Sequence, residues 1–312
     1  MNSGIIFLRP EFKEKIWGGT KLRTVFGYDI PYEKTGECWT ISANPEGDCY
    51  IVSGKYAGKH LSELWEKHKE LFGYATGDKF PILTKIIDAE QDLSIQVHPD
   101  DEYALEHENN SLGKTECWYV LDCDDDASVV LGHKARNKVE LEEMIYQKRW
   151  KEFIREIPIH RGDFFQIEPG CVHAIKGGTL ILETQQNSDI TYRIYDYDRL
   201  QNGVPRELHT KKCLDVIMDS HEVNQIQPVV LRDDCYKVTR FVECDYYTVE
   251  KFEINNATII KQPYKFMNVS VIEGIGIIDG IQINKGDSFI IPYKHPDIHF
   301  DGKLHMIISY IK

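Results

Sequence analysis

The chain has 312 residues and a formal net charge of −13, from 37 basic and 50 acidic side chains. That charge argues against a general binder of nucleic acid or of anionic membranes. No apolar run approaches the roughly 18–20 residues needed to cross a bilayer, so we expect neither nucleic acid nor a membrane as a partner. An apolar content of 42% with 28% charged residues is typical of a globular protein, and the length suggests about two domains.

The cysteines and the first residues of the chain indicate the cellular compartment of the protein. Eight cysteines are scattered along the sequence without a C-x-x-C motif, which is typical of reduced thiols. The first residues lack the apolar core of a signal peptide. We therefore expect a cytoplasmic protein.

Short strands separated by turns dominate the predicted elements. Segments rich in β-branched and aromatic residues, bounded by Gly, Pro, Asp or Asn, predict strands at 36–43, 48–53, 93–98, 116–122, 127–132, 163–170 and 178–186. Helical periodicity is found at 61–73, 138–157 and 206–220. Many strands with few helices predict a mainly β fold, an antiparallel sandwich or barrel of the jelly-roll kind.

A second strand-rich stretch follows a boundary near residues 225–237. Within it, "NKGDSFIIPYKHPDIH" (284–299) resembles "HRGDFFQIEPGCVH" (160–173) of the first stretch. Two jelly rolls in tandem with a few added helices explain both the length and this internal repeat. We expect a metal-binding catalytic domain at 1–232 and a second jelly roll at 233–312, without metal because neither His295 nor His299 has a matching partner.

The stretch "SIQVHPDD" (94–101) raises the possibility of a metal site. Alternation along a strand places Ser94, Gln96 and His98 on one face, which could equally be a polar face exposed to water. Glu116 on a following strand and His173 after a Pro-Gly turn complete a set of one amide, two imidazoles and one carboxylate. Zinc suits this set best among the divalent metals, although a single histidine is usually no ligand.

Several spaced motifs together carry a resemblance to a known family. "LSIQVHPDD", "GKTECWYV", "PGCVHAI" and "ETQQNSDITYRIYDYDR" resemble the type I phosphomannose isomerases, metal-dependent enzymes of the cupin superfamily. The resemblance covers nearly the whole chain and is to the short form, which lacks an inserted helical domain. It implies one zinc per chain and the interconversion of mannose 6-phosphate and fructose 6-phosphate. The general cupin pattern fits less well, because Gln96 stands where a first histidine is usual.

The resemblance also implies roles for individual residues. The metal ligands are Gln96, His98, Glu116 and His173, and the catalytic residues are Arg193, Glu183, Lys114 and Asp189. Substrate-binding positions carried over from the family are Lys85 and Ser94, although Lys85 fits an ordinary strand lysine equally well. The need of a phosphate group for cations adds Arg199 as a candidate, and Trp17 is a candidate for sugar contact that fits packing of the barrel mouth better. One departure from the family is Gly113, where some long-form members carry a histidine, which leaves the group that opens the sugar ring undecided.

Two other functions fit parts of the same pattern. A non-catalytic cupin that binds or senses a phosphosugar would need no proton-transfer residues such as Glu183 and Arg193. A metal-dependent cupin oxygenase would favour more histidine ligands and would not need lysines for a phosphate group. The sequence therefore favours an isomerase, acting on a small sugar phosphate as a monomer or weak homodimer.

Overall fold

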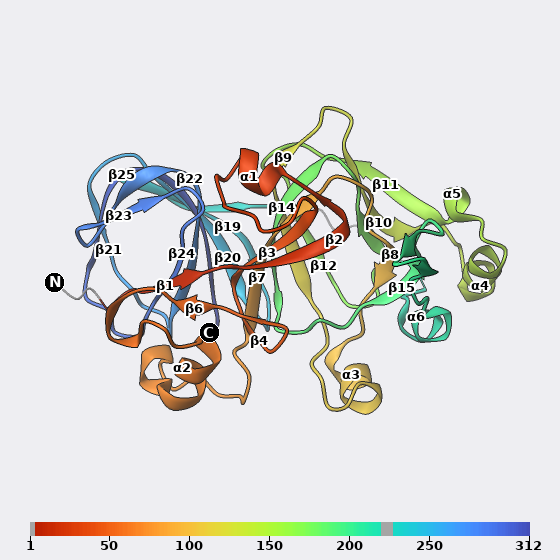
Figure 1. The fold of residues 1–312 in the computed structure, drawn as a ribbon, viewed down its shortest axis with the longest axis horizontal. Helices are drawn as coiled ribbons and strands as arrows, with labels where there is room; N and C mark the ends of the chain where they lie inside the picture. The colour runs from red at the N-terminus through yellow and green to blue at the C-terminus, as the bar shows by residue number, and fades with distance from the viewer. Residues whose placement is uncertain (1–3, 220–226) are drawn as a thin grey trace.

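The computed structural model describes residues 4–219 and 227–312. Two β-rich parts lie side by side along its long axis (Figure 1). The part coloured blue is built mainly by the C-terminal residues, and the other carries α3 to α6 on its outer surface. The mainly β fold of two cupin-type jelly rolls is confirmed.

The first part is a sandwich of two antiparallel sheets. Its six-stranded sheet has the order β12 (Phe164–Ile167), β9 (Glu116–Cys123), β14 (Thr179–Gln186), β7 (Ile82–Ala89), β2 (Glu11–Gly19) and β3 (Thr35–Ile41). Its five-stranded sheet has the order β11 (Ile154–Pro158), β10 (Ser128–His133), β13 (His173–Ile175), β8 (Ile95–Val97) and β15 (Tyr192–Tyr195). Both β7 and β14 are buried along their whole length, as expected for strands covered on both faces.

The second part is a single curved sheet of ten strands. Its main path is β18 (Val229–Asp233), β19 (Tyr236–Glu243), β20 (Thr248–Ile254), β25 (Ile298–Tyr310), β22 (Met267–Ile278), β24 (Ser288–Ile291), β1 (Ile6–Arg9) and β6 (Tyr50–Ile51). Two further strands, β21 (Thr258–Ile260) and β23 (Ile281–Asn284), pair with β25 and β22. Two strands of the N-terminal segment thus belong to this sheet, and β18 begins before residue 233. The division at residue 232 stays a prediction.

The helices are short, and two differ from the prediction. The range 138–157 contains α4 (Lys138–Tyr146) and α5 (Trp150–Phe153), separated by Lys148 at φ 55°, and then β11. Left-handed backbone at a non-glycine residue interrupts a helix, and pairing with β10 holds the following residues extended. The range 206–220 yields only α6 (Thr210–Val216), and residue 220 lies outside the described part.

The remaining elements are small. The range 61–73 folds as α2 (Leu61–Lys67) followed by a 3-10 turn, η2 (Lys69–Phe72), which ends at Gly73 in the left-handed conformation. The others are α1 (Lys21–Thr24), α3 (Asp101–His107), η1 (Gly54–Tyr56), and the two-stranded pairs β4 (Ala43–Asn44) with β5 (Gly47–Asp48) and β16 (Leu200–Gln201) with β17 (Val204–Pro205). In the described residues, no helix is both long and apolar enough to span a bilayer.

Alternation along β7 and β14 decides what faces the site. Ile86 and Leu182 point towards the second part, where they share a core with residues such as Ile307 of β25. Lys85 and Glu183 are opposite each other in register and point the other way, into the space between the two sheets. The sheet therefore buries one apolar face between the two parts and presents a charged pair on the other.

Candidate active site and metal centre

Three neighbouring strands bring the predicted metal ligands together. Gln96 lies in β8 and pairs in register with His173, the first residue of β13. His98 directly follows β8, and Glu116 is the first residue of β9 on the facing sheet. The Gln96 amide lies 3.1 Å from Nε2 of His173. Four residues that are far apart in the sequence thus meet between the sheets.

The geometry of this cluster suits a metal ion. Nε2 of His98 lies 3.4 Å from Glu116 Oε2, and Nε2 of His173 lies 3.5 Å from Glu116 Oε1. Ligand atoms of these three residues all lie within 4.8 Å of one another, and all three residues are buried. Among the described residues, this is the cluster of histidine, cysteine and acidic side chains that fits a metal.

Hydrogen bonds orient both imidazoles for coordination. Nδ1 of His98 lies 2.8 Å from the carbonyl oxygen of Ile190, and Nδ1 of His173 lies 2.9 Å from that of Cys171. A carbonyl only accepts, so each Nδ1 carries the proton and each Nε2 keeps its lone pair. That lone pair faces the Lys114 ammonium at 3.2 Å in His98 and the amide nitrogen of Gln96 at 3.1 Å in His173. This is the arrangement that metal-binding histidines use.

The protonation states also fit a metal centre. Burial, together with the nearby Lys114, lowers the pKa of His98 to about 3, so its ring is neutral at pH 7. Burial opposes ionisation of Glu116, but Lys114 and His98 outweigh it and hold the pKa of this carboxyl well below its usual range. Lys114 Nζ lies 2.7 Å from Glu116 Oε2. Two imidazoles, a carboxylate and an amide are ligands of borderline divalent metals.

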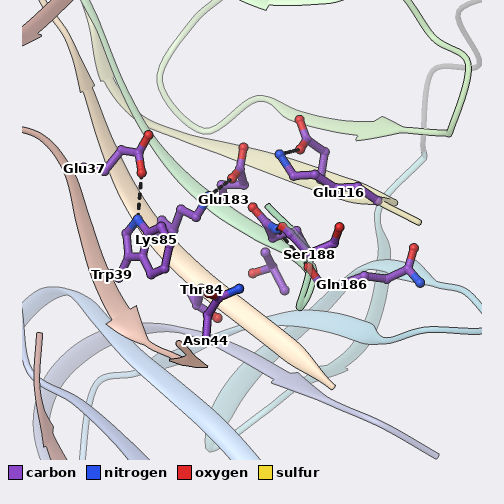
Figure 2. Close-up of polar contacts among 12 residues, drawn as sticks. Glu37, Trp39, Asn44, Thr84, Lys85, Glu116, Glu183, Gln186 and Ser188 are labelled. Atoms are coloured by element: carbon purple, nitrogen blue, oxygen red, sulfur yellow. Dashed lines mark hydrogen bonds and ion pairs between the residues drawn. The ribbon is translucent and has the colours of Figure 1, made fainter. Parts of the chain in front are cut away.

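A network of alternating charges extends from the metal cluster. Lys85 Nζ lies 3.4 Å from Glu183 Oε1, a pair that Figure 2 shows between β7 and β14. The indole N–H of Trp118 donates to Glu116 Oε1 and to Glu183 Oε2, each at 3.1 Å. This single donor therefore joins Glu116, a predicted metal ligand, to the neighbouring buried carboxyl.

The pKa values of the two buried carboxyl groups, Glu183 and Glu116, are shifted in opposite directions. Burial raises the pKa of Glu183, and the charge on Glu116 raises it further. Burial disfavours the charged form of Lys114, but Glu116 and Glu183 outweigh this effect and raise its pKa. With its raised pKa, Glu183 is thus the carboxyl better suited to exchange a proton, while Glu116 and Lys114 keep their charges.

A pocket of about 150 Å³ opens above this cluster. Eight residues with predicted roles line it: Trp17, Lys85, Ser94, Gln96, Lys114, Glu183, Asp189 and Arg193. Arg199 does not line it, because its guanidinium binds Asp196 Oδ1 at 2.5 Å and the carbonyl oxygen of Asp92 at 2.6 Å. The substrate-binding role predicted for Arg199 therefore has no support from its position.

Arg193 lies directly beside the metal cluster. It pairs in register with Gln96 across β15 and β8, and among the described residues its buried Nε has no hydrogen-bond partner. Burial lowers its pKa, and Arg206 lowers it further. A buried guanidinium with an unused donor is suited to bind an anionic group of a ligand.

Sequence reasoning missed several lining residues. They are Lys15, Glu37, Trp39, Thr191 and Arg206. Trp39 donates its indole N–H to Glu37 Oε2 at 2.7 Å, as Figure 2 shows. The signal was present in "GECWT", because alternation along a strand puts Glu37 on the same face as Trp39. Arg206 offered no such signal, since it lies after the β16–β17 hairpin.

Two packed antiparallel sheets with candidate histidine, glutamate and glutamine ligands between them are typical of a metal centre of the cupin class. Models of the phosphomannose isomerase type I catalytic domain and of the mannose-6-phosphate isomerase cupin domain match residues 5–145 and 237–311. The chain belongs to the type I phosphomannose isomerase family, a family of metalloenzymes.

Relatives and solved structures agree over the full length. Mannose-6-phosphate isomerase ManA of Bacillus subtilis is 46% identical over 100% of both chains. The mannose-6-phosphate isomerase of Streptococcus mutans is 44% identical over 98% of both. A crystal structure of mannose 6-phosphate isomerase from Bacillus subtilis has a TM-score of 0.96 and 48% identity, and covers 98% of this chain and 99% of its own.

Proposed function

We propose that this chain is a zinc-dependent mannose-6-phosphate isomerase, which interconverts mannose 6-phosphate and fructose 6-phosphate. The observation that carries the proposal is the position of Glu183, a buried carboxyl with a raised pKa that is joined through Trp118 to the metal ligand Glu116. Family membership and full-length relatives with this activity support the same reaction.

The reaction needs a proton carrier and a stabiliser of negative charge. Aldose–ketose interconversion moves a proton between C1 and C2 and passes through an enediolate. We assign the proton transfer to Glu183, because Lys85 and Trp118 orient its carboxyl and burial raises its pKa. Asp189 lines the same pocket and is the second candidate for moving protons, including those of ring opening.

The negative charge of the enediolate calls for cations. Zinc held by Gln96, His98, Glu116 and His173 would supply Lewis-acid chemistry when bound. Among the chain's own residues, Lys114 stays protonated beside Glu116. Arg193 has a buried donor to offer, and we assign it to the enediolate oxygens.

The phosphate end of the substrate needs its own cationic contacts. Lys15 and Arg206 line the pocket together with Arg193, and all three also line the adjoining cavity of about 490 Å³. We propose that this side of the pocket holds the phosphate, with Lys85, Ser94 and Trp17 contacting the sugar. Arg199 would act indirectly, by fixing Asp196, which also binds Arg206.

The proposal includes a cytoplasmic enzyme that acts as a monomer or weak homodimer. All eight cysteines are free thiols in the structure, and most are buried, as is typical of proteins from a reducing compartment.

A coupled assay for fructose 6-phosphate, with mannose 6-phosphate as substrate, tests the proposal. We expect turnover by the wild type, and a kcat lower by roughly 10²–10⁴-fold in Glu183→Gln, which keeps the size of the side chain but cannot carry the proton. Lys261→Met is the control, because Lys261 is exposed and does not line the active-site pocket. Tight binding of mannose 6-phosphate without turnover by the wild type would instead indicate a sensor and overturn the proposal.

A further inference from the structure

The internal repeat of the sequence folds into two equivalent turns. In 160–163 (HRGD) and 284–287 (NKGD), the glycine has a left-handed backbone, with φ of 93° at Gly162 and 97° at Gly286. In each turn the aspartate accepts a hydrogen bond from the N–H of the first residue, at 2.7 Å in both cases. The turns precede β12 and β24, so each part of the molecule contributes one.

These two turns meet at one cavity between the two parts. Arg161 and Lys285, which hold the same position in the two turns, both line a cavity of about 390 Å³. Its other walls come from β9, β20, β22 and β25 and from the residues after α1. None of its lining residues lines the active-site pocket. The cavity is therefore a separate feature of the molecule.

Two of the cations in this cavity are available to a ligand. Its lining includes three cations, Arg161, Lys251 and Lys285, and two carboxylates, Asp122 and Glu273, together with His305. Lys251 Nζ lies 3.4 Å from Glu253 Oε1, a carboxylate outside the lining, so Lys251 is already compensated. The cations that can attract an anion at this place are therefore those of the two turns, Arg161 and Lys285.

The partners of the two turn cations differ. Arg161 Nη2 lies 2.8 Å from Glu273 Oε2, in a pair whose side chains are 65% and 49% exposed, so the pair opens at little cost. The Lys285 ammonium lies 4.6 Å from the centre of the Phe26 ring, and among the described residues it forms no ion pair with a carboxylate. Burial and the charge of Arg161 lower its pKa. Both cations can therefore turn to a ligand.

We propose that this cavity binds a small phosphate-bearing anion, held between Arg161 of one part and Lys285 of the other. The planar fork of an arginine and the point charge of a lysine are the usual partners of phosphate oxygens. The volume lies in the range of small-molecule sites. Because the contacts come from both parts of the molecule, binding stabilises their association.

The test has two measurements, the position of a bound anion in crystals and the effect of phosphate on Tm. Neither depends on isomerase activity. Crystals of the metal-loaded protein are soaked in tungstate, a tetrahedral dianion like phosphate, and we expect anomalous density between Arg161 and Lys285. In solution, Tm is measured with and without inorganic phosphate at constant ionic strength. We expect the phosphate-dependent rise in Tm to fall at least by half in the Arg161→Gln/Lys285→Met double variant, and to stay unchanged in Lys261→Met.

Comparing each variant with itself, with and without phosphate, removes the effect of a lower basal stability. If the double variant fails to fold, Lys285→Met alone is measured in the same way. An equal phosphate-dependent rise in the wild type and in the variant would overturn the proposal, as would a soaked crystal with tungstate in the active-site pocket and none in this cavity.

Discussion

Substitution of Arg193 can distinguish a role in catalysis from a role in substrate binding. It pairs with Gln96 of the metal cluster, and its buried Nε has no hydrogen-bond partner among the described residues. An interaction made only with the enediolate lowers kcat when it is lost, whereas one made with the substrate throughout raises KM.

For Arg193→Ala we expect kcat to fall by roughly 10²–10³-fold with metal content and fold retained, the size typical of losing a preorganised stabiliser of negative charge. Arg193→Lys should recover little, because one ammonium cannot replace the planar guanidinium. Steady-state kinetics and metal analysis of the purified variants check this. A near-normal kcat with a raised KM would instead assign Arg193 to the phosphate group.

Trp118 acts on the chemistry through the two carboxylates that share its N–H. In Trp118→Phe both lose a buried donor, so we expect metal affinity to fall about 10–100-fold and kcat at saturating metal to fall about tenfold. Trp39→Phe is the matched control, because Trp39 donates to Glu37 instead of to a metal ligand. Equal metal affinities in the two variants would show that Trp118 only fills space.

Glu37 links the pocket wall to stability at low pH. Burial opposes its ionisation, but Lys15 and Lys85 outweigh burial and lower its pKa from 4.5 to about 2. Because the folded pKa is the lower one, Glu37 stabilises the fold above pH 4.5, and this contribution is lost as pH falls towards 2. At neutral pH, the free energy of unfolding of the wild type should exceed that of Glu37→Gln by about 1–3 kcal/mol.

That difference should shrink steadily between pH 4.5 and 2 in urea unfolding followed by circular dichroism. Glu66→Gln, at an exposed position, should show no such trend. A constant difference between wild type and Glu37→Gln at every pH would contradict the lowered pKa.

At the level of elements, β1 and β6 join the sheet formed mainly by the C-terminal residues. β1 pairs with β24 through Ile6–Ile290, Phe7–Phe289 and Leu8–Ser288, and Ile6 belongs to the shared apolar core. Without β1, the edge of β24 is left unpaired, and such an edge favours aggregation. The C-terminal segment is therefore expected to depend on the first strand of the chain.

We expect the isolated fragment 227–312 to be unstable or to aggregate, and a fragment with residues 4–9 attached through a flexible linker to be more stable. Thermal unfolding and light scattering of the two fragments check this. Equal stability of both fragments would instead indicate that the C-terminal segment folds as an independent domain, without the first strand of the chain.

The elements also show what the sequence could predict. Local alternation was enough to place Gln96 of β8 and His98, directly after it, on one side of the chain, and the spaced motifs were enough to add Glu116 and His173. Pairing between β1 and β24 was not predictable, because it joins residues more than 270 positions apart through backbone hydrogen bonds. The break at Lys148 was missed because helical periodicity continues across it.

At the scale of the whole molecule, an acidic protein places its cations where an anionic substrate needs them. The net charge is −13, yet the pocket wall carries Lys15, Lys85, Lys114, Arg193 and Arg206. Packing of the six-stranded sheet against the second part buries one of its faces, which fixes Lys85 and Glu183 on the other. The second part thus supports the site without supplying a residue to the metal cluster.

The central claim is that the cluster of His98, Glu116 and His173 is a metal centre on which isomerisation depends. The most direct measurement follows fructose 6-phosphate formation before chelation, after chelation and after zinc is added back, with metal content determined in parallel. We predict that the wild type loses activity on chelation and regains it with about one zinc per chain, whereas Glu116→Ala neither holds zinc nor regains activity. Full activity in metal-free wild type, or full zinc content in Glu116→Ala, would contradict the account.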